Sequence, residues 1–422
     1  MSWYMPTRII AGDSVVLKAN EYVQSILIAP SGPPSREGGH ARAPAWSRPR
    51  CLIVCGRQSA AASGALDDVN TLLDDCGIEG VLFERVSPNP TPQIVREGAR
   101  IAREAQAAMV IGIGGGSPLD AAKAIALFAV NDIPEADTFC PYTGRDALPI
   151  IAIPTTAGTG SEVTPYAILT NEAAQTKTSI SHVSMFPRLA LLDGRYTQSL
   201  SHETRINTAL DAFSHALEGC LTKRRTPFSR ALAHSTLAII GRQLRQLADG
   251  LAPDDDARQE LLEAASMAGM VIAQSGTTVG HALGYCLTVD RGIDHGRANA
   301  LVMASLLDVL ARSAGDEIAE LLRAAGFPPA RGTAAGAAST AGDASAGGAS
   351  GGATTALRRP LDRLLGERER ATEAEIADWA RRAAASKNLA NTICSPSRED
   401  LEDILRSSLA PAQNESRDRV QP

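Results

Sequence analysis

The sequence predicts an α/β domain with a mostly parallel sheet, followed by an all-α domain. Two observations lead to this fold class. Strand-like apolar runs alternate with helical stretches in the first half of the 422-residue chain, and nearly the whole second half has a helical pattern. Repeated strand-then-helix order is typical of a parallel sheet covered by helices. We expect the two domains at residues 1–197 and 198–422.

Each expected strand of the first domain is a short apolar run followed by a turn or a helix. The strands are expected at residues 51–56, 80–86, 107–117, 148–156 and 188–193. The helices between them are expected at residues 64–77, 90–106 and 118–130. Residues 31–50, rich in Pro and Gly, and residues 331–355, a Gly/Ala/Ser/Thr tract, interrupt this pattern. Such segments bury little apolar area, so we expect a loop insert in the first domain and a flexible insert in the second.

The composition is that of an ordinary globular protein. Hydrophobic residues make up 44% of the chain, charged residues make up 21%, and the net charge is -6. This mild acidity argues against a nucleic-acid binder, which needs a basic patch. No apolar run approaches the roughly 18 residues of a membrane span, and the N-terminal residues do not resemble a signal peptide. The seven cysteines are scattered, so we expect a cytoplasmic protein with reduced thiols.

A glycine-rich turn joins the expected strand at 107–117 to the helix after it. The turn consists of Gly114, Gly115, Gly116 and Ser117. Pro118 and Asp120 follow, and both are typical of a helix start. Glycines let a ligand approach the backbone closely, and the open N–H groups of a helix start attract anions. The turn therefore predicts a pyrophosphate site, although a tight turn that needs glycine only for packing would explain the same residues.

A second polar loop, at residues 154–164, follows the next expected strand. It gathers the hydroxyl side chains of Thr155, Thr156, Thr159 and Ser161. In open α/β sheets ligands bind at the carboxyl ends of the strands. Two such loops after two parallel strands favour a dinucleotide site over the alternative, a hydrophilic turn without a ligand.

The helical segment at residues 206–219 carries Asp211 and His215, four residues apart. These positions lie on the same face of a helix. The two side chains are either a hydrogen-bonded pair within the core or two metal ligands. His281 and His295 lie further along the chain, 14 residues apart. One carboxylate and three imidazoles suit Fe²⁺ or Zn²⁺ with a position left open for substrate.

Four motifs together resemble the iron-containing (group III) alcohol dehydrogenases of the dehydroquinate-synthase-like superfamily. The stretches GGGSPLDAAKA, PTTAGTGSEVT, LDAFSHALEG and GHALGY…DHGRANA occur in the order of the family motifs. The resemblance implies a Rossmann-like cofactor domain and a helical metal-binding domain. The implied metal ligands are Asp211, His215, His281 and His295. The implied cofactor residues are Gly114, Gly115, Gly116, Ser117, Asp120, Thr155, Thr156, Thr159, Ser161 and Lys177.

Three positions depart from the family pattern. Tyr285 stands where many members have a second histidine near the nicotinamide, Asp294 replaces a proline, and Ala209 replaces a glycine. We regard Tyr285 as the candidate proton relay, with a ribose hydroxyl as the alternative. These changes suggest a distinct substrate specificity.

The residues after the first long strand bear on the choice of nicotinamide. Family members that prefer NAD often carry an aspartate there, which binds the adenosine ribose and would repel a 2′-phosphate. This chain has Gly56, Arg57 and Ser59 instead, which leave room and hydrogen-bond donors for a phosphate. We predict NADP(H) over NAD(H); the competing interpretation is that Arg57 faces solvent.

The resemblance implies a metal-dependent alcohol dehydrogenase or aldehyde reductase. Hydride would pass between NAD(P)(H) and a small alcohol or aldehyde, while the metal, Fe²⁺ rather than Zn²⁺, polarises the substrate oxygen. The alternatives are a maleylacetate-reductase-like or phosphonoacetaldehyde-reductase-like enzyme of the same superfamily, or a binding protein without turnover. Because the family is commonly dimeric or larger, we expect a homodimer.

Overall fold

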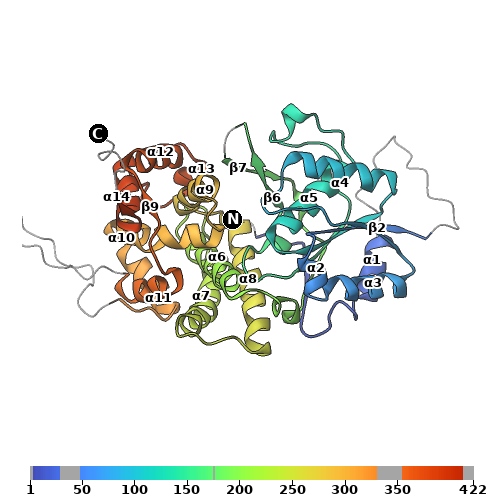
Figure 1. Ribbon diagram of the computed structural model, residues 1–422, viewed down its shortest axis with the longest axis horizontal. Coiled ribbons are helices and arrows are strands. Elements are labelled where there is room, and N and C mark those ends of the chain that lie inside the picture. Colours follow the sequence, from blue (N-terminus) through green and yellow to red (C-terminus); the bar gives the residue numbers. More distant parts are fainter. Residues whose placement is uncertain (1–2, 29–47, 174–175, 330–353, 412–422) are drawn as a thin grey trace, which may run out of the picture. The chain divides into compact units, whose positions relative to one another are not determined.

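The structure is a computed structural model. It describes residues 3–28, 48–173, 176–329 and 354–411. The two inserts predicted at residues 31–50 and 331–355 therefore lie almost entirely outside the described residues. Figure 1 shows the ribbon of the structure with its helices and several of its strands labelled.

The contacts divide the chain into two compact units. Unit 1 comprises Met1–Ala212 and Pro253–Gln274, and unit 2 comprises Phe213–Ala252 and Ser275–Pro422. This division differs from the predicted boundary at residues 197 and 198. The first half of helix α6 (His202–Cys220) and nearly all of helix α8 (Asp255–Ser275) pack with the sheet unit.

The sheet of unit 1 confirms the predicted parallel α/β fold. In the described part of the chain it has six parallel strands in the order β1-β8-β5-β4-β2-β3. They are β1 (Arg8–Ala11), β2 (Arg50–Cys55), β3 (Glu79–Phe83), β4 (Met109–Gly114), β5 (Ile150–Pro154) and β8 (Leu189–Leu192). Every residue of β4 and β5 is buried, because strands covered on both faces are continuous apolar runs. The short edge strand β1 lies outside the predicted strands.

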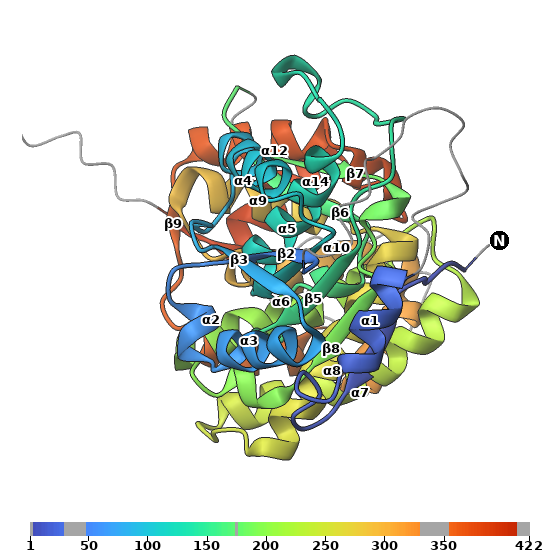
Figure 2. The ribbon, with the colours of Figure 1, turned by 90° about the vertical axis from the view of Figure 1, so that its right-hand side faces the viewer.

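Helices cover both faces of this sheet (Figure 2). One face carries α1 (Asn20–Ile28), α2 (Ser59–Ala62) and α3 (Ala65–Cys76), and the other carries α4 (Pro92–Glu104) and α5 (Gly116–Ala129). Successive side chains of a strand point to opposite faces. Leu52 and Val54 of β2 accordingly enter the core beneath α4 and α5, while Ile53 and Cys55 enter the core beneath α1 and α3.

The direction of strand order reverses at β2. From β2 the chain moves outward to β3 and then returns as β4 on the other side of β2. The carboxyl ends of β2 and β4 therefore flank a topological switch point, where open α/β sheets bind ligands. Gly56 follows β2 there, and the glycine turn follows β4. A separate antiparallel hairpin, β6 (Tyr166–Asn171) and β7 (Thr176–Ser181), follows the second polar loop.

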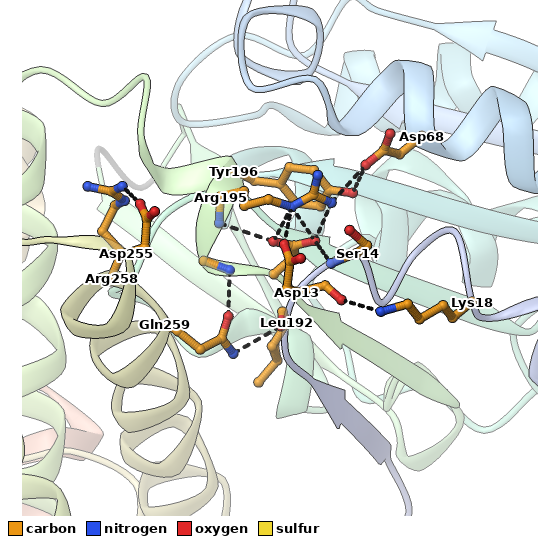
Figure 3. Close-up of polar contacts among 12 residues, drawn as sticks. Asp13, Ser14, Lys18, Asp68, Leu192, Arg195, Tyr196, Asp255, Arg258 and Gln259 are labelled. Carbon is orange, nitrogen blue, oxygen red and sulfur yellow. Dashed lines mark hydrogen bonds and ion pairs between the residues drawn. The ribbon is translucent and has the colours of Figure 1, made fainter.

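A polar network fixes the loops after β1 and β8 (Figure 3). The buried carboxylate of Asp193 accepts hydrogen bonds from Ser14 N at 2.8 Å and from Arg195 Nη2 at 2.6 Å. Arg195 also pairs with Asp68 of α3 at 3.1 Å, and Tyr196 Oη donates to Asp68 at 2.7 Å. Burial and the bond to Asp68 raise the pKa of Tyr196. These contacts tie two neighbouring strand ends to one helix.

Unit 2 confirms the predicted helical second domain. Helix α10 (His295–Ala324) contacts α7, α9, α11 and α14. The other elements are α7 (Pro227–Ala248), α9 (Val279–Arg291), α11 (Thr355–Leu365), β9 (Arg370–Ala371), α12 (Glu373–Ala384), α13 (Lys387–Asn391), α14 (Arg398–Ser408) and β10 (Ala410–Pro411). The second half of α6 joins them through Phe213, whose ring meets Phe327 edge-on at 6.0 Å. Among the described residues, no helix has the length and apolar character needed to cross a membrane.

Candidate functional site

The glycine turn lies where β4 ends and α5 begins. Gly114 has a φ of +142°, and a Cβ atom there would lie 2.7 Å from Cγ of Pro118, so a larger residue does not fit. Helix α5 begins at Gly116, two residues before the predicted start. Pro118 is tolerated because N–H groups in a first helical turn lack helical acceptors in any case. The N-cap residue Gly115 makes no side-chain cap, so the first N–H groups of α5 can meet an anion.

The glycine turn and the second polar loop lie against each other at the carboxyl ends of β4 and β5 and form one continuous surface. A Cβ atom on Gly115 would lie 3.1 Å from Thr156 Oγ1, and one on Gly116 would lie 2.7 Å from Thr159 Cγ2. Thr155 N donates to Gly114 O at 3.0 Å. These contacts bring together the predicted cofactor residues Gly114, Gly115, Gly116, Thr155, Thr156 and Thr159.

The hydroxyl group of Thr155 is buried in this surface and can form a hydrogen bond with a polar ligand. The residue is only 2% exposed, and none of the described residues forms a hydrogen bond with its Oγ1. A buried hydroxyl group without a partner is unfavourable. A nucleotide oxygen would satisfy it, so the donor chemistry of the loop fits a dinucleotide.

Asp120 and Ser161 bond to each other beneath this surface. Ser161 Oγ donates to Asp120 Oδ1, and Ile168 N donates to Asp120 Oδ2 at 2.8 Å. The ammonium group of Lys123 lies 3.0 Å from Asp120 Oδ1 and donates to Ser161 O at 3.0 Å. Both carboxylate oxygens of Asp120 therefore bind protein groups. This arrangement shapes the loop, and a direct contact of Asp120 or Ser161 with the cofactor stays a prediction.

The remaining predicted cofactor residues lie on neighbouring segments of unit 1. Ser117 Oγ, in the first turn of α5, accepts a hydrogen bond from Asn89 N at 3.1 Å in the loop after β3. Gly56 follows β2, and a Cβ atom there would lie 3.6 Å from Ser59 Oγ. Lys177 lies on β7 of the hairpin that follows the second loop.

The predicted metal ligands come from three helices. Asp211 and His215 lie one turn apart on the continuous helix α6, His281 lies in the first turn of α9, and His295 is the first residue of α10. A carboxylate oxygen of Asp211 and one ring nitrogen from each of His281 and His295 lie within 4.8 Å of one another. The ring of His215 stacks on that of His281 with centroids 4.9 Å apart. The carboxylate oxygen and the two imidazole nitrogens gathered in this way, with the imidazole of His215 beside them, fit a divalent transition metal.

Glu218 orients one of these ligands. It lies on the same stripe of α6 as Asp211 and His215, and its Oε1 accepts a hydrogen bond from His281 Nδ1 at 2.8 Å. Its Oε2 accepts one from Thr278 N at 2.8 Å. Because a carboxylate can only accept, Nδ1 of His281 carries the proton and Nε2 offers its lone pair, the arrangement that orients metal-binding histidines. Burial would raise the pKa of Glu218, but its interaction with His281 and the hydrogen bonds from Thr278 outweigh burial and lower the pKa.

Asn299 and Tyr285 contact the predicted metal ligands His281 and His295. Asn299 Nδ2 lies 3.2 Å from His281 Nε2 and 3.3 Å from His295 Nε2, so these two nitrogens point toward one place. Gly284 makes room for Asn299, since a Cβ atom there would meet Asn299 Oδ1 at 1.9 Å. The ring of Tyr285 stacks on that of His295, with centroids 5.0 Å apart and an angle of 11° between the planes.

The sequence analysis did not predict that Glu218 and Asn299 contact the predicted metal ligands. The signal for Glu218 was present, because it stands seven residues after Asp211 and three after His215 and so shares their helix face. The contact of Asn299 with two histidines has no such local signal, because it joins the starts of α9 and α10 in space.

Known proteins resemble this chain in sequence and in structure. The family model of the iron-containing alcohol dehydrogenases matches residues 36–194, and the C-terminal model of the Fe-containing alcohol dehydrogenase family matches residues 205–409. The chain is 37% identical to a probable alcohol dehydrogenase, EutG, of Salmonella typhimurium (strain LT2), over 49% of this chain and 52% of that protein. The match thus spans about half the length of that relative.

Two further comparisons cover more of the molecule. The chain is 28% identical to an NADPH-dependent butanol dehydrogenase of Clostridium saccharobutylicum, over 65% of this chain and 71% of that protein. The structure of an iron-containing alcohol dehydrogenase from Thermotoga maritima superposes with a TM-score of 0.80 and 32% identity, over 97% of this chain and 99% of that one. Because the two family models together cover most of the chain, including five strands of the parallel sheet and most of the helical unit, the chain belongs to the iron-containing alcohol dehydrogenase family of oxidoreductases.

Proposed function

We propose that this protein is a metal-dependent reductase of small aldehydes, and a dehydrogenase of the corresponding alcohols, that uses NADP(H). Membership in the family supports NAD(P)-dependent oxidoreduction of alcohols and aldehydes. The observation that carries the proposal is the gathering of donor atoms from Asp211, His281 and His295. The ring of His215, the fourth ligand that we propose, stacks on that of His281.

The four ligand residues would hold one divalent ion, Fe²⁺ in preference to Zn²⁺. When bound, the ion supplies a Lewis acid for the substrate oxygen. Glu218 keeps Nε2 of His281 available by holding Nδ1 at 2.8 Å. Asp211, His215 and His281 are buried, and the exclusion of water strengthens electrostatic interactions at such a site.

The two polar loops of unit 1 would hold the cofactor. We assign the pyrophosphate to the first N–H groups of α5, which no side chain caps. We assign an oxygen of the nicotinamide ribose to the buried hydroxyl group of Thr155. The nicotinamide supplies the hydride chemistry, and the task of these residues is to hold it in one orientation.

We assign the proton of the reaction to Oη of Tyr285. This residue is half-buried, and its ring stacks on that of His295. Stacking holds the phenol group beside the ligand cluster. During aldehyde reduction Oη would give its proton to the substrate oxygen and recover one from solvent.

The preference for NADP(H) rests on the residues after β2. Gly56 has no side chain, and a Cβ atom built on it would lie 3.6 Å from Ser59 Oγ. The side chain of Arg57 is exposed. A 2′-phosphate would meet a hydroxyl and a guanidinium group there, with no aspartate to repel it. The name of the butanol dehydrogenase relative, which specifies NADPH, is consistent with this choice.

The first experiment is a turnover assay with the metal-loaded protein. The protein would be purified anaerobically, reloaded with Fe²⁺ or Zn²⁺, and mixed with NADPH or NADH and a panel of small aldehydes. We expect metal-dependent oxidation of NADPH that is lost in His281→Ala. The matched control is His202→Ala, which removes an exposed histidine at the start of α6.

Three outcomes would contradict parts of the proposal. Absence of bound metal in the reloaded protein would refute the ligand assignment. Bound metal without turnover of any aldehyde would refute the assigned reaction. Faster oxidation of NADH than of NADPH would refute the cofactor preference. The homodimer and the cytoplasmic location stay predictions, which light scattering and cell fractionation would test.

A further inference from the structure

One face of helix α8 is in direct backbone contact with the second polar loop. A Cβ atom on Gly269 would lie 2.6 Å from Gly160 Cα and 2.8 Å from Val163 Cγ2. In the opposite direction, a Cβ atom on Gly160 would lie 2.4 Å from Gly269 Cα. One turn earlier on α8, Ser266 Oγ donates a hydrogen bond to Glu162 Oε1. Two neighbouring loop residues, Gly160 and Glu162, are therefore held by one helix.

The same loop is tied from the other side to α5. Glu162 and Lys123 are both fully buried. Lys123 Nζ donates to Ser161 O at 3.0 Å and to Thr164 Oγ1 at 3.1 Å, on either side of Glu162. Burial raises the pKa of Glu162, opposed by the hydrogen bond from Ser266 and the attraction of Lys123. Buried charges are tolerated only when they are paired, so these contacts leave the loop little freedom to shift.

The N-terminal half of α8 is anchored to the end of strand β8 (Figure 3). Gln259 Oε1 accepts a hydrogen bond from Gly194 N at 2.7 Å, and Gln259 Nε2 donates to Leu192 O at 3.2 Å. A Cβ atom on Gly194 would lie 2.7 Å from Gln259 N, so the two backbones touch here as well. Helix α8 is thus fixed at two places along its length to other segments of unit 1, the second polar loop and the end of β8.

We propose that helix α8 positions the second loop for cofactor binding and that Gly269 and Ser266 are positioning residues for NAD(P)(H). The inference rests on the proposed function, which assigns the cofactor to this loop. Neither residue belongs to the glycine turn or to the loop itself. Each acts through the loop residue that it holds, Gly160 or Glu162.

A displacement of Gly160 would also move Thr159, the residue before it, whose side chain lies on the surface proposed to bind the cofactor. Thr159 Oγ1 accepts a hydrogen bond from Ser161 N at 3.3 Å. The side chain of Thr159 also packs on the glycine turn, because a Cβ atom on Gly116 would lie only 2.7 Å from Thr159 Cγ2. The loop therefore cannot move away from α8 without changing its fit to the start of α5. Misplacement of a binding group by about 1 Å is enough to cost a large factor in binding or rate.

The test compares cofactor affinity in two variants, Gly269→Ala and Ser266→Ala. Alanine is normally better than glycine within a helix, but at 269 its methyl group would meet Gly160 at 2.6 Å. Titration of the protein with NADPH, followed by the fluorescence of the nucleotide, would measure Kd. We expect Kd to rise on the order of ten-fold in Gly269→Ala and several-fold in Ser266→Ala. The KM for NADPH should rise with Kd, while metal content and kcat at saturating NADPH stay near the wild-type values.

The matched control is Gly98→Ala in α4. A Cβ atom at that position would lie 2.4 Å from Ile125 Cδ1, so the change strains the same unit but touches a core side chain instead of the loop. It should lower the melting temperature and leave Kd unchanged. If Gly269→Ala and Ser266→Ala behave like Gly98→Ala, with lower melting temperatures and a wild-type Kd, the proposal is overturned. If Gly269→Ala does not fold, the result for Ser266→Ala decides.

The wild-type titration separates this inference from the function on which it rests. Wild-type protein that binds neither NADPH nor NADH would refute the assigned cofactor. Wild-type binding with unchanged affinity in both variants would refute only the role of α8.

Discussion

Replacement of Glu218 by glutamine tests whether this carboxylate orients a metal ligand. Glu218 accepts hydrogen bonds from Nδ1 of His281 at 2.8 Å and from the backbone N of Thr278 at 2.8 Å. Glutamine has nearly the same shape but only one acceptor oxygen. If its amide nitrogen faces His281, it favours the tautomer with the proton on Nε2, which competes with the metal. If the nitrogen faces Thr278, the backbone N–H at the start of α9 loses its acceptor.

The expected loss of metal affinity follows from these two arrangements. Loss of the partner that orients a ligand histidine typically lowers metal affinity about 10- to 100-fold. That range corresponds to about 1.4 to 2.8 kcal/mol of binding free energy. The lower end applies if the oxygen stays on His281, and the upper end applies if the histidine changes tautomer.

Competition with a chromophoric chelator would measure the affinity of the apo protein for Zn²⁺. Glu317→Gln is the matched control, because Glu317 also lies in unit 2, on α10, but pairs with Arg225 at 3.0 Å. We expect weaker Zn²⁺ binding in Glu218→Gln and wild-type binding in Glu317→Gln. Equal affinities in Glu218→Gln and wild type, with the helical content intact, would refute the orienting role.

Three further predictions concern the proton, the cofactor and the thiols. Tyr285→Phe keeps the ring but removes Oη, so kcat for aldehyde reduction should fall about 100-fold at unchanged metal content; an unchanged kcat would place the proton elsewhere. Gly56→Asp should shift the ratio of kcat/KM for NADPH over NADH toward NADH by about ten-fold or more, since a carboxylate repels the 2′-phosphate; an unchanged ratio would mean that the phosphate lies elsewhere. Burial raises the pKa of Cys286 to about 11, whereas Cys140 and Cys394 are exposed. Iodoacetamide at mildly alkaline pH should therefore alkylate Cys140 and Cys394 first in the native protein; peptide mass spectrometry that finds Cys286 labelled equally fast would contradict this.

Much of the fold and of the candidate site follows from local patterns in the chain. Strands β2, β4 and β5 are apolar runs that stand between helices, and this alternation depends only on residues near in sequence. The i and i+4 spacing of Asp211 and His215 places both on one helix face by helical geometry alone. The glycine turn could be predicted for a similar reason, because Gly114 is required by its own backbone angle and by Pro118, four residues later.

Other features depend on contacts between distant segments. Edge strand β1 has four residues and half-exposed side chains, so its pairing with β8 leaves little periodicity in the sequence. The helical pattern of α8 reveals an apolar face but not the unit that the face covers. Only the packed structure places Gly269 against Gly160 and Ser266 against Glu162, more than 100 residues apart in each case.

The sequence by itself thus determined the strand–helix order, the glycine turn and the placement of Asp211 and His215 on one face of α6, because each results from spacing within a few residues. The tertiary structure alone decided which groups support them: Glu218 beside His281, Lys123 beneath the second loop, and α8 behind it. The physical reason is that a buried polar group needs a partner at hydrogen-bond distance. Which residue supplies that partner depends on how whole elements pack, and this is not encoded in the spacing of residues along any one of them.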